Sequence, residues 1–144
     1  ICDDGQTSLL ARLVDVNFPD YKQVLPSNFN NTIKIDKNEI TDALQRASVV
    51  LQEKSKGVKI YIGENKMEIR AISEEGESTE EIQIEKLTEP LDVGFNVKYL
   101  IDALGTYDNK EICFSVGDEV SPACIFASEE DRYRQLSVVM PMRV

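Results

Sequence analysis

Hydrophobic and polar positions change their period along the chain, and the change occurs twice in the same order. Residues 32–36 alternate between apolar and polar side chains, which is typical of a half-buried strand. From residue 37, apolar residues recur every three or four positions, which predicts a helix over about 37–51 with one buried face. Alternation then returns and predicts three strands, at 58–62, 67–72 and 80–85.

The same succession begins again 60 residues later, so that Ile33 corresponds to Val93. The offset predicts a strand at 91–95, a helix at 97–105, and three strands at 111–116, 122–127 and 135–140. We therefore infer an internal duplication of a β-α-β-β-β unit. The predicted fold class is α+β, with two adjacent helices on a curved, mostly antiparallel sheet. Pseudo-two-fold symmetry is expected to relate residues 32–85 to 92–140.

Residues that cap or break regular structure stand between the predicted elements. Asp36 and Asn96 each precede a predicted helix, where a short side-chain oxygen accepts hydrogen bonds from first-turn N–H groups. The stretch from Gly63 to Lys66 predicts a hairpin turn, and the stretch from Glu74 to Ser78 predicts a longer polar loop.

The N-terminal part of the chain follows a different pattern. Residues 1–18 predict a strand pair, with a turn at Asp3-Asp4-Gly5. Turn-forming residues then dominate 17–21 and 26–31, so we predict a domain boundary near residue 20. The sequence starts with isoleucine inside this strand pair, and we interpret it as a piece of a longer protein. Its 144 residues, 42% of them hydrophobic, suit one domain with a fragment of another.

The last seven residues, Val138 to Val144, are unusual for a chain end because most of them are large and apolar. Pro141 lacks an N–H group and therefore ends the ladder pairing of the preceding strand. Met140 and Met142 flank it, and methionine side chains repack readily around different partners. The residues leave two interpretations open: the ordinary end of a core strand, or one face of a binding surface.

The composition argues against several classes of protein. No apolar run approaches the ~18–20 residues of a membrane span, and no signal peptide opens the chain. The cysteines, Cys2, Cys113 and Cys124, lie far apart, which favours reduced thiols in the cytoplasm, the last two as core residues. Histidine is absent, as are P-loop, GxGxxG and GxSxG motifs, so the sequence assigns no catalytic residue, metal or cofactor.

The net charge of −10 is concentrated in one stretch. Residues 74–92 hold eight of the 26 acidic side chains and only one of the 16 basic ones, Lys86. The remainder has 18 acidic and 15 basic residues, which leaves room for a locally basic face. The block from Glu74 to Glu85 has the spacing of a solvated strand face. A metal-dependent phosphodiester or phosphate enzyme using this block is one alternative, and a purely structural oligomerisation module is another.

Several groups of residues together resemble one family, the bacterial DNA sliding clamp, which is the β subunit of DNA polymerase III. Besides the duplicated unit, they are Phe18-Pro19-Asp20-Tyr21 with Val24-Leu25-Pro26, Gly94-Phe95-Asn96-Val97 with Tyr99-Leu100, and the ending Val139 to Val144. The resemblance covers the whole chain. It implies the DNA-clamp fold, with residues 1–20 as the end of the middle domain and 21–144 as the third domain. It also implies a non-catalytic processivity factor whose three-domain subunits form a homodimeric ring around duplex DNA.

The resemblance implies a hydrophobic pocket that docks short peptides of the polymerase, the clamp loader and repair proteins. The matching positions are Pro19, Val24, Asn96, Tyr99, Val120, Val138, Met140, Pro141, Met142 and Arg143. From spacing alone, Asn96 is sufficiently explained as a helix cap, and Tyr99 as a helix residue with its ring on the core. With the resemblance, we expect Met140, Pro141 and Met142 to form one wall of a pocket. Its other walls are expected to be Pro19, Val24 and Val138.

The resemblance also assigns surfaces outside the pocket. The two helices are expected to line the pore, with Arg46 matching a pore-facing arginine and Lys37, Lys54 and Lys98 as its neighbours. The acidic strands are then expected to face outward, away from the DNA. Val49 and Val50 match an apolar pair that packs across the subunit interface in the family.

Overall fold

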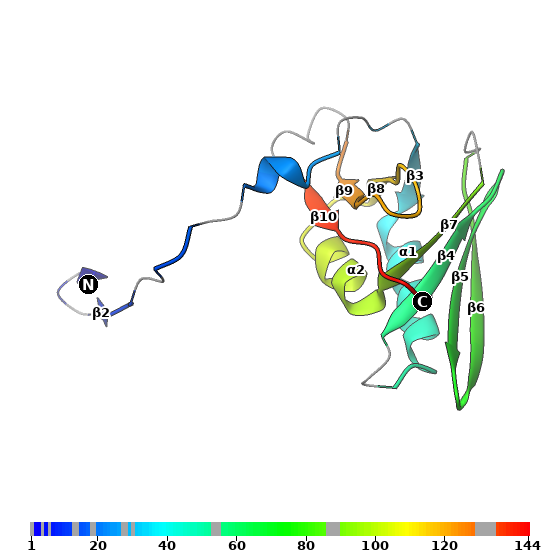
Figure 1. Ribbon diagram of the computed structural model, residues 1–144, viewed down its shortest axis with the longest axis horizontal. Coiled ribbons are helices and arrows are strands. Elements are labelled where there is room, and N and C mark those ends of the chain that lie inside the picture. Colours follow the sequence, from blue (N-terminus) through cyan, green and yellow to red (C-terminus); the bar gives the residue numbers. More distant parts are fainter. Residues whose placement is uncertain are drawn as a thin grey trace.

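The N-terminal hairpin lies away from the rest of the chain (Figure 1). The computed structural model describes residues 2–3, 5, 7–12, 15–17, 20–26, 29, 31–52, 56–85, 90–128 and 135–144. Strands β1 (Cys2–Asp3) and β2 (Ser8–Leu9) pair antiparallel, which confirms the predicted strand pair in a form only two residues long. The 3-10 helix η1 (Tyr21–Gln23) follows, with Asp20 as its N-cap. Two predicted site residues, Pro19 and Lys54, lie outside the described residues.

The remaining elements repeat one succession, as the sequence predicts. The first unit consists of β3 (Thr32–Asp36), α1 (Lys37–Ser48), β4 (Gly57–Ile62), β5 (Lys66–Ser73) and β6 (Gly76–Gln83). The second unit consists of β7 (Leu91–Asn96), α2 (Val97–Leu104), β8 (Glu111–Ser115), β9 (Ala123–Phe126) and β10 (Ser137–Val139). Helix α1 is shorter than predicted because the N–H groups of Val49 and Leu51 bond three residues back, which tightens the turn.

The two units exchange their first strands. Strand β3 pairs with β8 of the second unit, and β7 pairs with β4 of the first unit. The result is two four-stranded antiparallel sheets, ordered β10-β9-β8-β3 and β6-β5-β4-β7, rather than the one curved sheet of the prediction. The exchange is symmetric in register, since Ile33 faces Phe114 and its counterpart Val93 faces Ile60. Neither unit therefore completes a sheet without the other.

Equivalent caps begin the two helices. The Asp36 carboxylate accepts hydrogen bonds from the N–H groups of Asn38 and Glu39, at 2.9 and 3.1 Å. The Asn96 side-chain oxygen accepts one from the N–H of Lys98, at 3.0 Å. Both predicted N-caps are thus confirmed. Each satisfies N–H groups that have no partner within their own helix.

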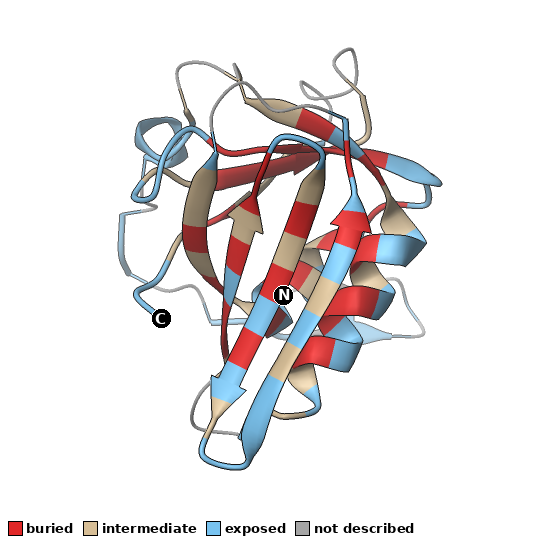
Figure 2. Cartoon of the chain, turned by 90° about the vertical axis from the view of Figure 1, so that its right-hand side faces the viewer, coloured by how far each residue is buried: buried red, intermediate tan, exposed pale blue. Residues whose placement is uncertain are grey.

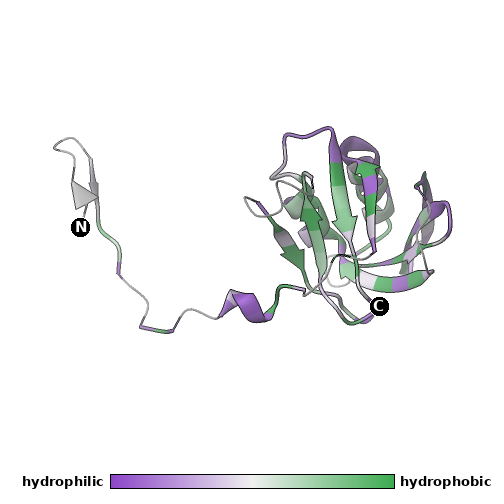
Figure 3. Ribbon diagram, turned by 90° about the horizontal axis from the view of Figure 1, so that it is seen from above, coloured by the Kyte–Doolittle hydropathy of each residue, from purple (hydrophilic) through white to green (hydrophobic). Residues whose placement is uncertain are grey.

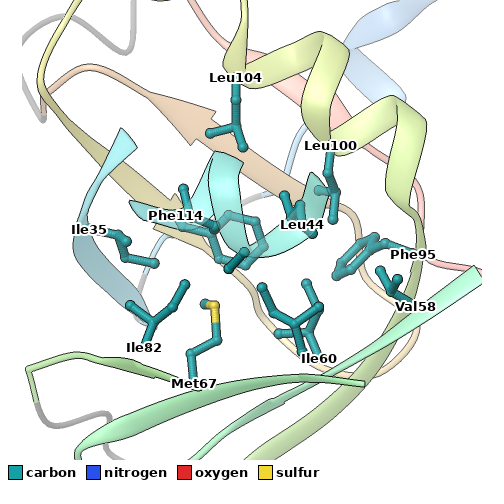
Figure 4. Close-up of a cluster of buried hydrophobic side chains, with 14 of the residues drawn as sticks. Ile35, Leu44, Val58, Ile60, Met67, Ile82, Phe95, Leu100, Leu104 and Phe114 are labelled. Carbon is teal, nitrogen blue, oxygen red and sulfur yellow. The ribbon is translucent and has the colours of Figure 1, made fainter. Parts of the chain in front are cut away.

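The core lies where both helices meet both sheets (Figure 4). Leu44 projects into it from α1, and Leu100 and Leu104 project from α2; all three are at most 1% exposed. Helix α1 packs against α2, β5 and β6, whereas α2 also packs against β7 and β10. The rings of Phe95 and Phe114 meet edge to face, with centroids 6.3 Å apart. Because these two rings come from different sheets, their contact joins the halves of the molecule.

A second, smaller apolar cluster covers the other side of β8 and β9. Cys113, Cys124 and Phe126 are buried there, as predicted for the two cysteines, and Phe29, Leu136 and Val138 pack against them. The Phe29 and Phe126 rings meet edge to face at 5.5 Å. Burial raises the pKa of the Cys124 thiol to about 11, so the group is a packed, neutral thiol rather than a reactive one.

The acidic stretch supplies the turn and second strand of the β5–β6 hairpin. This hairpin carries exposed and hydrophilic residues (Figures 2 and 3). Its turn is only Glu74-Glu75, so the longer polar loop predicted from Glu74 to Ser78 is wrong. The strand already begins at Gly76. The outer side chains pair with one another, as Lys66 does with Glu81 at 3.1 Å.

Candidate functional site

The last five residues, Met140 to Val144, cross from one sheet to the other, and we call them the tail. Strand β10 ends at Val139 in the first sheet, and the chain then runs past α2 to β7 and β4 (Figure 1). There, the N–H of Met142 donates a hydrogen bond to the Gly94 carbonyl oxygen, at 2.8 Å. The tail is therefore docked on its own domain and still leaves side chains exposed, with Met140 at 56% and Met142 at 43%.

Two glycines provide the surface on which the tail lies, and we call Gly57 and Gly94 the glycine seat. They belong to neighbouring strands and to the same sheet face, because Gly57 is opposite Asn96 and Gly94 is opposite Lys59. A Cβ on Gly94 would overlap the Met142 carbonyl oxygen. A Cβ on Gly57 would lie 2.9 Å from a Val144 methyl carbon. The tail occupies the space that side chains would otherwise fill.

The loop between β8 and β9 faces the tail and has a fixed internal structure. The Asp118 carboxylate accepts hydrogen bonds from the N–H groups of Val120 and Ser121, at 2.9 and 2.6 Å. The bond from the Val120 N–H contributes most to lowering the pKa of Asp118, so the carboxylate is held in its charged form. This arrangement presents Val120 to solvent, where it is 80% exposed.

The tail and this loop together border two hollows. The first, which we call the Met140 hollow, has a volume of about 440 Å³ and is lined by Gln23, Val24, Pro26, Gly117, Asp118, Ser121, Pro122 and Met140. The second, the Met142 hollow, has a volume of about 480 Å³ and is lined by Lys59, Asp92, Val93, Gly94, Glu119, Val120, Met142, Arg143 and Val144. Pro141 stands between the two methionines that give the hollows their names. Both hollows are lined by apolar and polar residues together, which suits a peptide rather than a wholly apolar ligand.

The structure brings some of the predicted site residues together and separates others. Val24 and Met140 share one hollow, whereas Val120, Met142 and Arg143 share the other. Asn96 caps α2, and Tyr99 on the same helix is 61% exposed, so its ring does not lie on the core.

Val138 does not line either hollow but packs in the cluster around Phe126. The expected pocket of Met140, Pro141 and Met142 with Pro19, Val24 and Val138 stays a prediction, because Pro19 lies outside the described residues. The tail contributes Met140 to the first hollow and Met142, Arg143 and Val144 to the second.

Several residues of the hollows are not among the predicted site residues. They are Gln23, Pro26, Gly117, Asp118, Ser121 and Pro122 of the first hollow, and Lys59, Asp92, Val93, Gly94, Glu119 and Val144 of the second. The loop residues have a sequence signal, because glycine, aspartate, serine and proline cluster between two strands. Gly94 also has one, since an isolated glycine inside a strand indicates that another backbone comes close.

The residues predicted to face DNA have unequal surroundings. Arg46 binds Glu80 of β6 through both its Nη2, at 2.7 Å, and its Nε, at 2.8 Å. Glu80 of the acidic stretch therefore turns toward α1, and the expectation that the acidic strands face away from the DNA stays a prediction. Lys37 donates to the Tyr107 carbonyl oxygen at 2.7 Å, and Lys98 borders a hollow of about 270 Å³ between the helix ends. Lys54 lies outside the described residues.

The two predicted interface residues also differ from each other. Val49 is 82% exposed just after α1, whereas Val50 packs against the core. Within the described residues, no group of three or more histidine, cysteine, aspartate or glutamate side chains could hold a metal ion. In the same part of the chain, no helix is long and apolar enough to cross a membrane.

The fold and the site define a class of domain. Its two repeated units exchange their first strands, and its apolar tail borders a hollow that Gln23 of η1 also lines. Residues 22–143 match the family described as DNA polymerase III beta subunit, C-terminal domain. The chain belongs to this family. The resemblance and the fold class inferred from the sequence are thereby confirmed.

Individual relatives agree with the family match. The Beta sliding clamp of Pseudomonas aeruginosa is 33% identical over 141 residues, which are 97% of this chain and 38% of the relative. The Beta sliding clamp of Escherichia coli strain K12 is 34% identical over 143 residues, with the same coverage of 97% and 38%. The chain thus spans 38% of the length of these curated relatives.

Solved structures give the same result. The crystal structure of the DNA polymerase III subunit beta from Pseudomonas aeruginosa matches with a TM-score of 0.86 and 33% identity, over 93% of this chain and 37% of that chain. The beta subunit from Thermotoga maritima matches with a TM-score of 0.83 and 33% identity, over 92% and 36% of the two chains.

Proposed function

We propose that this chain is part of a DNA sliding clamp, a non-catalytic processivity factor that docks short peptides of partner proteins at the tail. The observation that carries the proposal is the pair of hollows beside Pro141, with an exposed methionine in each. Flexible thioether side chains suit a surface that receives different peptides. The replicative polymerase, the clamp loader and repair proteins are the partners expected for this family.

The two hollows support docking of an extended peptide. Apolar groups at Val24 and Met140 would receive one large apolar side chain, and those at Val120 and Met142 would receive another. Full burial of one leucine or aromatic side chain contributes roughly 1.5–3 kcal/mol. Arg143 and Glu119 at the rim of the Met142 hollow would orient the polar groups of the peptide.

Deletion of residues 140–144 tests this proposal. We expect the truncated chain to bind a clamp-binding peptide at least about tenfold more weakly, since it loses walls of both hollows. The fold should persist, because β10 pairs with β9 through Val139, before the deletion begins. Isothermal titration of the intact and truncated chains measures the effect, and circular dichroism checks the fold. Equal affinity of the two chains would mean that the tail is only the end of a core strand.

We further propose that residues 1–20 belong to a middle domain and 21–144 form a third domain, since the family match begins at residue 22. In the full-length protein, two subunits would close a ring around duplex DNA, with no membrane association and a cytoplasmic location. The helices would line the pore. Arg46, Lys37, Lys54 and Lys98 would attract phosphates over a distance without gripping bases, which leaves the ring free to slide.

The exposed side chain of Val49 supports its place in the subunit interface, with Val50 beneath it. In the full-length protein, Val49→Asp should shift the ring toward monomers, because a charge would replace buried apolar surface. Analytical ultracentrifugation measures the dissociation constant. Val120→Asp is the matched control, because that residue is equally exposed but lies in the Met142 hollow. A dimer as tight as the unsubstituted one would contradict this assignment.

A further inference from the structure

The glycine seat carries an inference that deepens the proposed peptide-binding function and rests on it. We propose that Gly94 and Gly57 are positioning residues of the peptide site. Their missing side chains leave the space in which the tail lies, and the docked tail keeps Met140 and Met142 in separate hollows. Glycine weakens a strand interior, because it loses more conformational entropy on folding than other residues and packs no side chain. Gly94 lies inside β7 and Gly57 begins β4, and both leave space that the tail occupies.

Gly94 is the more restrictive of the two positions. An added Cβ would overlap the Met142 carbonyl oxygen, and it would lie 2.6 Å from the Val144 Cγ2. The carbonyl belongs to the backbone, so no side-chain rotation can relieve the overlap. The tail would have to lift, and the hydrogen bond from the Met142 N–H to the Gly94 oxygen would be lost with it.

Gly57 is restrictive in a different way, since its added Cβ would meet only side chains. The nearest atoms are Val144 Cγ2 at 2.9 Å, Val144 Cγ1 at 3.3 Å and Met142 Cε at 3.6 Å. Val144 is 60% exposed and can move away. The two glycines therefore predict effects of different size, and only the effect at Gly57 can be relieved by shortening Val144.

The glycine seat positions both methionines because it fixes one end of a short segment, Val139 to Met142, whose other end is fixed in β10. Val139 is held at the near end by its pairing with Ala123 in β9. Met142 is held at the far end by Gly94. Only Met140 and Pro141 lie between these anchors, so Met140 has little freedom to leave its hollow. Lifting the tail from Gly94 would free Met140 and would remove Met142, Arg143 and Val144 from the second hollow.

The test compares the variants Gly94→Ala, Gly57→Ala, Val144→Ala and Gly57→Ala/Val144→Ala with the unsubstituted chain. The probe is a synthetic peptide from the clamp-binding segment of the replicative polymerase, titrated calorimetrically. Methionine methyl NMR signals report the position of the tail independently of the peptide. Gly105→Ala is the matched control, because its added Cβ has no neighbour closer than 3.4 Å.

We expect Gly94→Ala to lower the affinity for the peptide about tenfold or more and Gly57→Ala to lower it about threefold, whereas Gly105→Ala should leave the affinity unchanged. The double variant should return to the affinity of Val144→Ala alone. Thermal unfolding of Gly57→Ala should occur at the same or a higher temperature, since alanine suits a strand better than glycine, so reduced affinity would not reflect a damaged fold.

Unchanged affinity in Gly94→Ala with displaced methyl signals would overturn the positioning role while leaving the peptide site intact. If Gly94→Ala fails to fold, the Gly57→Ala variants provide the test. A loss of peptide affinity in Gly57→Ala that is not relieved by adding Val144→Ala would also overturn the positioning role. Failure of the unsubstituted chain to bind the peptide would instead overturn the proposed function, and this inference with it.

Discussion

The two units of the duplication share their topology but differ in what their last strands carry. In the first unit, β5 and β6 have eight residues each, and their outer face is held by ion pairs such as that between Lys66 and Glu81. In the second unit, β9 has four residues, all buried, and β10 has three. A second apolar layer around Phe126 covers these short strands, and the tail follows them.

This difference shows how a repeated fold acquires separate surfaces. The exchange of first strands and the equivalent helix caps are common to both units and build the core. The candidate peptide site lies where the second unit departs from the first, at the β8–β9 loop and the tail. The charged hairpin lies where the first unit departs from the second. The duplication therefore builds the core of the domain, and the divergence accounts for its proposed peptide contacts.

The largest effect is expected from removing the contact that the units share. Phe114 is 1% exposed and meets Phe95 across the two sheets, so Phe114→Ala should lower the free energy of unfolding by about 3–5 kcal/mol. Urea denaturation followed by circular dichroism measures this loss. Tyr99→Ala, on an exposed ring, is the control and should change stability by less than about 0.5 kcal/mol.

The same variant shows whether the units fold together. Because neither unit completes a sheet alone, amide hydrogen exchange should accelerate in both units of Phe114→Ala by the same factor. Faster exchange confined to β8, β9 and β10 would contradict the view that strand exchange makes the domain one cooperative structure.

An intermediate effect is expected at Arg46 of α1, which pairs with Glu80 of β6 within the first unit. In the full-length ring, Arg46→Glu should shorten the residence time on duplex DNA and change its salt dependence, because one phosphate-attracting charge is reversed. The new carboxylate would also face Glu80, the present partner of Arg46. Glu80→Gln is therefore the necessary control, since it frees the arginine and should leave the residence time equal or longer. Residence that is unchanged by Arg46→Glu across a salt series would contradict a DNA-facing role.

Much of the fold could be predicted because its signals are local. The two caps, Asp36 and Asn96, and the apolar stripes of both helices depend on residues three or four positions apart. The start of β6 could not be found in this way. Its strand begins at Gly76 with polar residues on both faces, because Glu80 faces inward to bind Arg46. An inward glutamate whose partner lies 34 residues away has no signature in the alternation of the strand.

The candidate site could be predicted less fully, for a physical reason. Resemblance brought Val24, Val120 and the two methionines onto one list, but it did not indicate that Val24 and Met140 border one hollow and Val120 and Met142 another. The division follows from the path of the tail, which depends on the contact between Met142 and Gly94. That contact joins residues far apart in the chain. Only the glycine itself, isolated inside a strand, carries a trace of it in the sequence.

The smallest effects are expected in the titration of one carboxylate from each unit. The pKa of Glu68 is lowered chiefly by its hydrogen bond to Lys66 and then by Arg70, whereas the pKa of Asp118 is lowered chiefly by the backbone N–H of Val120. Both folded-state values lie below the ordinary ones, so each group stabilises the fold above its ordinary pKa. That contribution is lost as the pH falls through the lowered value.

The two carboxylates should differ in their response to salt, which sharpens the contrast between the units. Salt screens the cations beside Glu68, so its pKa should rise toward the ordinary value of 4.5 as salt is added. The N–H groups that bind Asp118 are part of the folded loop, so its pKa should stay below 3.8 at every salt concentration. Carboxyl carbon NMR titrations at low and high salt measure both values. In Asp118→Asn, the Val120 and Ser121 amide signals should lose the part of their pH dependence that comes from the carboxylate they bind, because an amide side chain does not titrate. Equal salt sensitivity of the two carboxylates would mean that the β8–β9 loop depends on exposed charges as much as the β5–β6 hairpin does.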